Sequence, residues 1–226
     1  MNPILRPRWL LGHLLAAGVV VGFIALGLWQ LDRHAEKSDL RAAVAAGQEL
    51  SPTDLADAAE GSFRRVVVVG EYDDRLQALV LRSRGGVSGY HVLTPLTVEG
   101  GPAVLVDRGW IPLDLGPPAP PAGLVKVDGV LWPAQEGSSV PDALPEVVRR
   151  IDPEIQAAFA GYPLRSDYLI LSGPSDGLPI PAEPPGIGLG PHLGYAGQWF
   201  LFAAIVLIGY PLLLRRTLLR SGDNGP

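Results

Sequence analysis

The stretch HLGYAGQWFLFAAIVLIGYPLLL, residues 192–214, decides the fold class, because its apolar run contains no acid, lysine or arginine. About 20 such residues are enough for a helix to cross a bilayer. A second run of the same kind occupies residues 10–31. We therefore predict two transmembrane helices, at 10–31 and 192–214. Two buried core helices of a soluble protein are the alternative.

The first apolar run also resembles a signal peptide in its position. It is longer than the apolar core of a signal peptide, which spans about 7–15 residues, and no small-x-small cleavage site follows it. The charged helix-forming segment DRHAEK follows instead, at residues 32–37. We expect an uncleaved anchor.

Basic residues beside the second run predict the topology. Arg215, Arg216 and Arg220 follow it, whereas residues 180–194 contain no lysine or arginine. Loops that carry the excess of lysine and arginine stay in the cytoplasm. Two spans place both termini on the same side. We predict a multi-pass membrane protein whose segments 1–9 and 215–226 are cytoplasmic and whose segment 32–191 is extracytoplasmic.

Composition excludes several kinds of function. The net charge is −5, and all acids but one lie within residues 32–191, which argues against nucleic acid as a partner. The chain has no cysteine, so disulfides, thiol chemistry and thiolate metal sites are excluded. Its single methionine, Met1, leaves no soft sulfur ligands for a copper carrier.

Residues 32–191 show the short apolar runs and turn signals of a β-rich domain. The first helix is expected to continue to a stop at Gly47, and a short helix is expected at 51–58 after Ser51. The predicted strands are 63–72, 76–83, 89–98, 102–111, 124–132 and 166–171. Short turns between them favour antiparallel pairing. The expected class is an α+β membrane protein with an antiparallel barrel or sandwich. Proline and glycine mark a loop at 112–123 and a linker at 172–191.

Candidate functional residues gather where the second span begins. His192, Tyr195, Ala196 and Trp199 follow the spacing of one helical face. Tyrosine and tryptophan are typical of the membrane interface, which explains them without a ligand. A neutral imidazole at the membrane edge is also suited to bind iron. Both interpretations stay open.

A second polar cluster ends the first span. It comprises Trp29, Gln30, Arg33, His34 and Lys37. Trp29 and Arg33 are spaced as neighbours on a helix, and lipid headgroups are the alternative partners of the cations. If the spans pack together, this cluster and the one around His192 meet on the outer side of the membrane.

Small residues predict that the two spans approach closely. Gly18 and Gly22 form a small-xxx-small pattern in the first span. Gly197, Ala203 and Ala204 provide small side chains in the second.

The β-rich domain contains the motif DRGW at residues 107–110. Arg108 is expected to pair with a carboxylate, either of a ligand or of an acid in the domain. The chain has no nucleophile elbow, P-loop, HExxH or GxGxxG motif. We therefore expect a protein that is not an enzyme.

These motifs in this order resemble the Surfeit-locus family of cytochrome c oxidase assembly factors. The matching segments are LGLWQLDRHAEK (26–37), GEY (70–72), GYHVLTPL (89–96), VLVDRGWIP (104–112) and HLGYAGQWF (192–200). Asp107 departs from the family, in which many members have asparagine before the Arg-Gly pair. That departure weakens any role that needs an amide at this position.

The resemblance implies a bacterial chaperone that binds haem a and assists its insertion into the catalytic subunit of the oxidase, with haem a synthase as a further candidate partner. It places the haem-linked histidine on His192, as an iron ligand, and the family's tryptophan and glutamine on Trp29 and Gln30. On this hypothesis Tyr195 and Trp199 wall the macrocycle, and Arg33 or Arg108 pairs with a propionate. A scaffold or accessory subunit that holds no haem, and a two-span extracytoplasmic sensor, are the alternatives.

Overall fold

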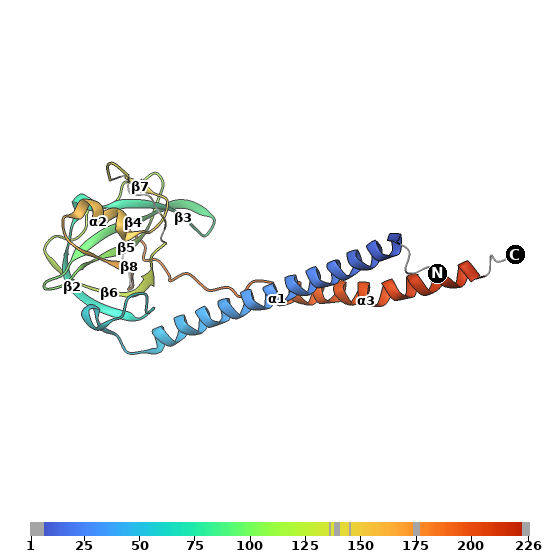
Figure 1. The fold of residues 1–226 in the computed structure, drawn as a ribbon. Helices are drawn as coiled ribbons and strands as arrows, with labels where there is room; N and C mark the ends of the chain where they lie inside the picture. Colours follow the sequence, from blue (N-terminus) through green and yellow to red (C-terminus); the bar gives the residue numbers. More distant parts are fainter. Residues whose placement is uncertain (1–6, 136, 138–140, 145, 174–176, 223–226) are drawn as a thin grey trace. The chain divides into compact units, whose positions relative to one another are not determined.

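The computed structural model describes residues 7–135, 137, 141–144, 146–173 and 177–222 (Figure 1). The chain divides into two compact units. The helical unit comprises Met1–Arg41 and Ile187–Pro226, and the barrel unit comprises Ala42–Gly186. The far ends of both predicted cytoplasmic segments, and residues 174–176 of the predicted linker, lie outside the described residues.

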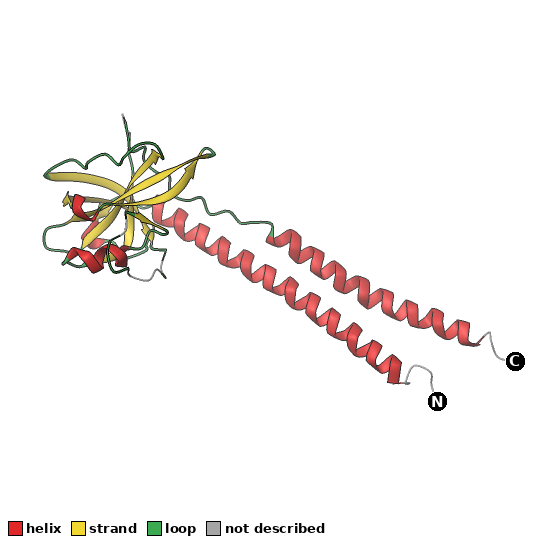
Figure 2. Ribbon diagram, turned by 90° about the horizontal axis from the view of Figure 1, so that it is seen from above, coloured by secondary structure: helices red, strands yellow, loops and turns green. Residues whose placement is uncertain are grey.

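The helical unit is built from α3 (His192–Gly222) and from α1 (Pro7–Glu49) as far as Arg41, and the two helices run antiparallel (Figure 2). Polar side chains link the two helices near both ends of their apolar runs: His13 contacts Tyr210, and Gln30 contacts His192. Both helices are long and apolar enough to cross a membrane, which indicates a membrane protein.

The predicted stop at Gly47 was wrong, because α1 continues to Glu49. The carbonyl of Ser62 would clash with a side chain at residue 47, so glycine is needed there for close packing. The glycine thus serves a contact within the barrel unit and does not end the helix.

The predicted packing of small residues was wrong at three glycines. A Cβ would meet no heavy atom within 4 Å at Gly18, Gly22 or Gly197. The close approach lies at Gly27 instead, where a Cβ would lie only 2.6 Å from the ring of Phe200. Ala203 is buried, as expected for a packed face, and so is Ala196. A small residue therefore contacts the other helix only if the rotation of its own helix about its axis places it on the interface.

The barrel unit contains one sheet whose strands are ordered β1-β2-β6-β8-β5-β4-β3-β7 (Figure 1). An additional pairing of β2 with β4 closes β2, β6, β8, β5 and β4 into a barrel, while β1, β3 and β7 extend the sheet. The strands are β1 Thr53–Asp54, β2 Arg65–Tyr72, β3 Ala78–Arg84, β4 Val87–Thr97, β5 Ala103–Pro112, β6 Leu124–Pro133, β7 Val147–Val148 and β8 Leu164–Leu171.

The six predicted strands are all present, and the barrel is confirmed over the sandwich. Strand β3 pairs antiparallel with β4 as expected, and so does β4 with β5 across the turn at 99–101. Three pairings are parallel: β5 with β8, β1 with β2, and β3 with β7. Strand β8 inserts between β5 and β6 after a long connection, so turn length could not predict its direction.

The short helix expected at 51–58 was wrong. The segment forms β1 and a 3₁₀ turn, Leu55–Asp57. Thr53 pairs with Val66, and the side chain of Leu55 enters the barrel core, so burial overrides the local helix signal. A second helix, α2 (Pro153–Ala160), escaped prediction.

The interior of the barrel is apolar. Inward-facing side chains come from β2, β4, β5, β6 and β8, as alternation along each strand requires. The core comprises Leu55, Ala58, Val66, Val68, Leu96, Val104, Val106, Val127, Leu131 and Leu169. Partly buried Tyr72, Val125 and Leu171 pack against it.

Candidate functional site

The central feature of the helical unit is a hydrogen bond between its two helices. His192 is the first residue of α3, and its Nδ1 lies 2.8 Å from Oε1 of Gln30 on α1. An amide oxygen only accepts, so Nδ1 carries the proton and donates. In the neutral imidazole the other ring nitrogen, Nε2, then keeps its lone pair. The histidine is therefore held in the tautomer that suits a ligand to a metal.

The turn before α3 leaves room for that nitrogen. Gly190 has φ +65°, a left-handed conformation that favours glycine. A Cβ at this position would lie 3.1 Å from Nε2 of His192. The glycine therefore allows the chain to turn into α3 without a side chain beside the imidazole.

Aromatic rings from both helices lie along the same interface. The rings of Trp199 and Phe23 are 5.6 Å apart between centroids, and Phe202 packs edge-on against Trp199 at 5.9 Å. These rings form an apolar layer within the helical unit. Tyr195 is half exposed and has no ring contact among the described residues.

The cationic part of the predicted cluster lies on α1. The guanidinium of Arg33 sits 5.8 Å from the ring centroid of Trp29, as its i, i+4 spacing predicted. Its Nη1 also lies 2.7 Å from Oε2 of Glu36, and both side chains are exposed. An exposed pair of this kind contributes little to stability, so the guanidinium can exchange partners at small cost.

The structure thus brings some of the predicted site residues together. Gln30 contacts His192 between the helices, and Trp29 contacts Arg33 on α1. Trp199 lies against Phe23 in the same unit. Arg108 belongs to the barrel unit, which is described by itself.

Arg108 is buried in the barrel unit and binds only neutral oxygens. Its Nη1 donates to Gln77 Oε1 at 2.9 Å and to the carbonyl of Pro118 at 3.0 Å. Its Nη2 donates to the carbonyl of Ala119 at 3.2 Å. The ring of Tyr72 lies 5.6 Å from the guanidinium. The expected pairing with an acid of the domain was therefore wrong, as far as the described residues extend.

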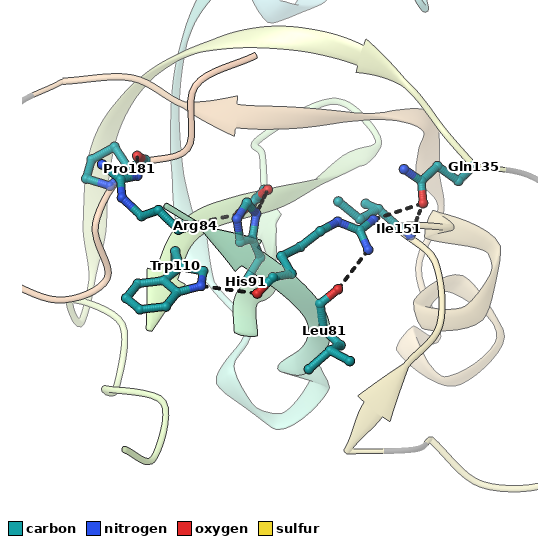
Figure 3. A network of polar contacts seen from close by, with 10 residues as sticks. Leu81, Arg84, His91, Trp110, Gln135, Ile151 and Pro181 are labelled. Atoms are coloured by element: carbon teal, nitrogen blue, oxygen red, sulfur yellow. Dashed lines mark hydrogen bonds and ion pairs between the residues drawn. The ribbon is translucent and has the colours of Figure 1, made fainter. Parts of the chain in front are cut away.

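The remainder of the DRGW motif is structural. Asp107 accepts from His91 Nδ1 at 2.7 Å and from the backbone N–H of Gly109 at 3.0 Å. Trp110 Nε1 donates to the carbonyl of Arg82 at 3.3 Å, within a network drawn in Figure 3. Each oxygen of the Asp107 carboxylate thus has a hydrogen-bond partner inside the domain.

The motif also holds the middle of the linker. The backbones of Trp110 and Ile180 exchange hydrogen bonds of 2.7 and 2.8 Å. Gly109 has φ +118° and lies against the backbone of Ile180, so a side chain there would be both strained and blocked. The close contact with Ile180 and the positive φ explain why glycine occupies this position of DRGW.

One polar link was missed by sequence reasoning. Tyr210 Oη lies 2.7 Å from His13 Nδ1, and both residues border an apolar cavity of about 330 Å³ in the helical unit. The available signal was a histidine inside one apolar run and a tyrosine inside the other, since polar groups in a span are rare without a partner. Only the antiparallel register shows that the two meet.

Comparison with known proteins gives one consistent result. The model of the SURF1 family matches residues 17–204. An uncharacterised SURF1-like protein of Mycobacterium bovis is 30% identical over 233 aligned positions, covering 91% of this chain and 83% of that protein. A SURF1-like protein of Monosiga brevicollis is 28% identical, covering 92% of this chain and 89% of that protein. The chain belongs to the SURF1 family, whose members are known generally as assembly factors of cytochrome oxidase.

Proposed function

We propose that this protein assists the assembly of haem-copper cytochrome c oxidase by binding haem a at the outer end of its two helices. The observation that supports the proposal is the hydrogen bond from His192 to Gln30. Metal-bound histidines almost always donate their second ring N–H to an oxygen, which fixes the ring and raises its basicity. Gln30 provides that oxygen, and Nε2 is left for the iron.

The surrounding residues fit a haem. The macrocycle is apolar and carries two anionic propionates at one edge, so it suits an apolar site beside water with cations at its rim. Trp199 lies in the aromatic layer of the helical unit, and Tyr195 and Trp29 are half exposed. On this proposal Tyr195 and Trp199 wall the ring, and Arg33 pairs with a propionate.

The helical unit would hold the haem and hand it on. Haem a supplies redox chemistry in the finished oxidase. An assembly factor that carries the haem therefore needs a site that can release it. Of the two histidines in the polar clusters, His192 is the proposed ligand, and His34 is not assigned a role. His192 would hold the haem until its transfer to the catalytic subunit, and haem a synthase is the proposed donor.

We further propose that the protein resides in the bacterial cell membrane with both termini in the cytoplasm. The arginines after α3 support this orientation. The barrel unit then faces outward, on the side of the membrane where the polar ends of the spans, Gln30 and His192, also lie.

The proposal is tested by purifying the full chain from cells that synthesise haem a and recording its absorption spectrum. We expect the purified protein to contain bound haem a. In cells that lack the protein, the oxidase should have a lower haem a content. If the pure protein is colourless while its loss still impairs the oxidase, a scaffold without haem replaces this proposal.

A further inference from the structure

The barrel unit contains a cavity that the proposed function does not use. Its volume is about 500 Å³, and its lining includes Tyr72, Val125 and Leu171, which pack against the core of the barrel. The cavity therefore lies at one mouth of the barrel. Barrel mouths are common places for ligand sites, because inward-facing side chains from several strands converge there.

Arg108 brings a buried positive charge to this cavity. Its side chain lines the cavity, yet the residue is only 5% exposed. Three hydrogen bonds join its guanidinium to Gln77, Pro118 and Ala119, all through neutral oxygens. A guanidinium has five N–H donors, so two remain without a partner in the part of the chain that the structure describes. Burial lowers the pKa of Arg108, and only Tyr72 offsets that effect.

Removing a charge from water costs free energy. An opposite charge or a full set of hydrogen bonds is needed to offset that cost. The nearby residues do not provide that charge. No aspartate or glutamate is among the residues that line the cavity. Lys126 lines it as well, and its side chain is exposed on β6. The cavity is therefore electropositive within its described walls.

A bulge in β5 directs Arg108 to this position. His91 and Leu93 of β4 pair with Trp110 and Asp107, so β5 has one extra residue in this stretch. A bulge of this kind reorients side chains and is frequent beside functional sites. The bulge is stabilised by the bridge between Trp110 and Ile180.

The remaining walls are apolar or weakly polar. Prolines from two loops, among them Pro120 and Pro179, close the sides, and Ser172 adds a hydroxyl. Tyr72 presents its ring to Arg108 and has no hydrogen bond from its hydroxyl to any described residue. The cavity thus combines an apolar body with two cations and two hydroxyls.

We infer that this cavity binds a carboxylate carried on an apolar body, with Arg108 and Lys126 contacting the carboxylate and the proline-rich walls enclosing the apolar part. The pairing of a guanidinium with a carboxylate is the strongest that the cavity can offer. The carboxylate has two sources, a free organic acid or the propionate of a haem. Both share the chemistry that Arg108 recognises. The inference does not depend on the haem site at His192.

The test uses the full chain in detergent and 1-naphthylacetate as the probe, with binding measured by calorimetry. We expect 1-naphthylacetate to bind and its neutral analogue, 1-naphthylacetamide, to bind at least about tenfold more weakly. The substitution Arg108→Gln should reduce the affinity at least about tenfold. Equal binding of the neutral analogue, or no binding of the acid, would overturn the inference.

Arg108 also holds the loop at 118–119, so its loss could unfold the barrel. Lys126→Glu tests the same site from an exposed position on β6. We expect it to weaken binding of 1-naphthylacetate at least about fivefold. The matched control is Arg65→Glu, a charge reversal at an exposed position. Arg65 lies at the end of β2 opposite to Tyr72, which lines the cavity. If the control weakens binding as much as Lys126→Glu, the attraction is a general charge effect and the cavity is not the site.

Competition distinguishes the two sources. Iron protoporphyrin with free propionates should displace 1-naphthylacetate if the cavity takes a propionate, whereas its dimethyl ester should not. If neither porphyrin competes while the acid still binds, the natural ligand is a free organic acid. The same titrations with His192→Ala show whether any porphyrin effect comes from the helical unit instead.

Discussion

His192 Nδ1 and Gln30 Oε1 lie 2.8 Å apart, which joins the first residue of α3 to the end of the apolar run in α1. The two residues are far apart in sequence, so the contact exists only if the helices run antiparallel in this register. It holds the imidazole with Nε2 free of partners among the described residues. The hydrogen bond gives a reason for a histidine as the first residue of α3, a position that other residues of the membrane interface could also occupy.

Substituting Gln30→Leu should impair haem binding while His192 remains in place. The variant removes the oxygen that fixes the ring, and losses of this kind reduce metal affinity by about 10–100-fold. Haem titration of the pure protein measures the effect. The matched control is Gln198→Leu, on an exposed face of α3. If both variants bind haem as the wild type does, the hydrogen bond serves helix packing alone.

Cysteine labelling should place the barrel unit outside the cytoplasm. The native chain has no cysteine, so single substitutions are unambiguous. A membrane-impermeant maleimide should label Ser88→Cys in intact cells and Leu219→Cys only after lysis. Both positions are exposed. Ser138, another candidate position for labelling, lies outside the described residues. Labelling of the two cysteines in the reverse order would invert the topology.

The barrel should lose stability in acid through Asp73. Hydrogen bonds from Arg75, at 2.8 and 2.7 Å, and from Tyr162, at 3.0 Å, lower the pKa of this carboxyl. Because the folded pKa is depressed, the stabilisation is complete above the unfolded pKa of about 4 and disappears as the pH falls through the folded pKa.

The corresponding measurement is the melting temperature between pH 7 and pH 3. Asp73→Asn should melt a few degrees below the wild type at pH 7, and the difference should shrink as the pH falls. Asp114→Asn, at an exposed position in a loop, is the control and should leave the profile unchanged. A constant difference between Asp73→Asn and the wild type would show that ionisation of Asp73 is irrelevant.

Gly109→Ala should destabilise the barrel unit by about 1–3 kcal/mol, because a residue other than glycine is strained at φ +118°. The added Cβ would also collide with the backbone of Ile180 and release the linker from β5. Urea unfolding of the full chain measures the loss. Gly116→Ala is the control, since its Cβ would meet no heavy atom within 4 Å. Equal stabilities of the two variants would contradict the role assigned to Gly109.

Much of the fold could be predicted from the sequence, since local patterns determine it. Apolar length marks both long helices, and alternation between turn residues marks six strands. Helix α2 could also have been found: Asp152 caps it, Pro153 follows, and Gly161 ends it at φ 72°. The segment 51–58 could not, because burial of Leu55 in the barrel outweighs its local preference.

The site was predictable only in part, because it depends on register and rotation. The spacing on each helix identified His192, Gln30 and Trp199, but not which atoms meet. Gly18 and Gly22 have the right spacing for packing and yet face no partner, since rotation about the helix axis is set by side chains elsewhere. Among the described residues Arg108 contacts no acid, and this arrangement depends on the closure of the barrel, which no single segment reveals.

The most direct test of the central claim is the haem content of His192→Ala, purified as the full chain from cells that synthesise haem a. Leu193→Ala, at the exposed neighbouring position, is the control. We predict that the control keeps the haem a spectrum of the wild type, and that His192→Ala retains only a small fraction of the haem at equal protein. Full occupancy and an unchanged spectrum in His192→Ala would contradict the account.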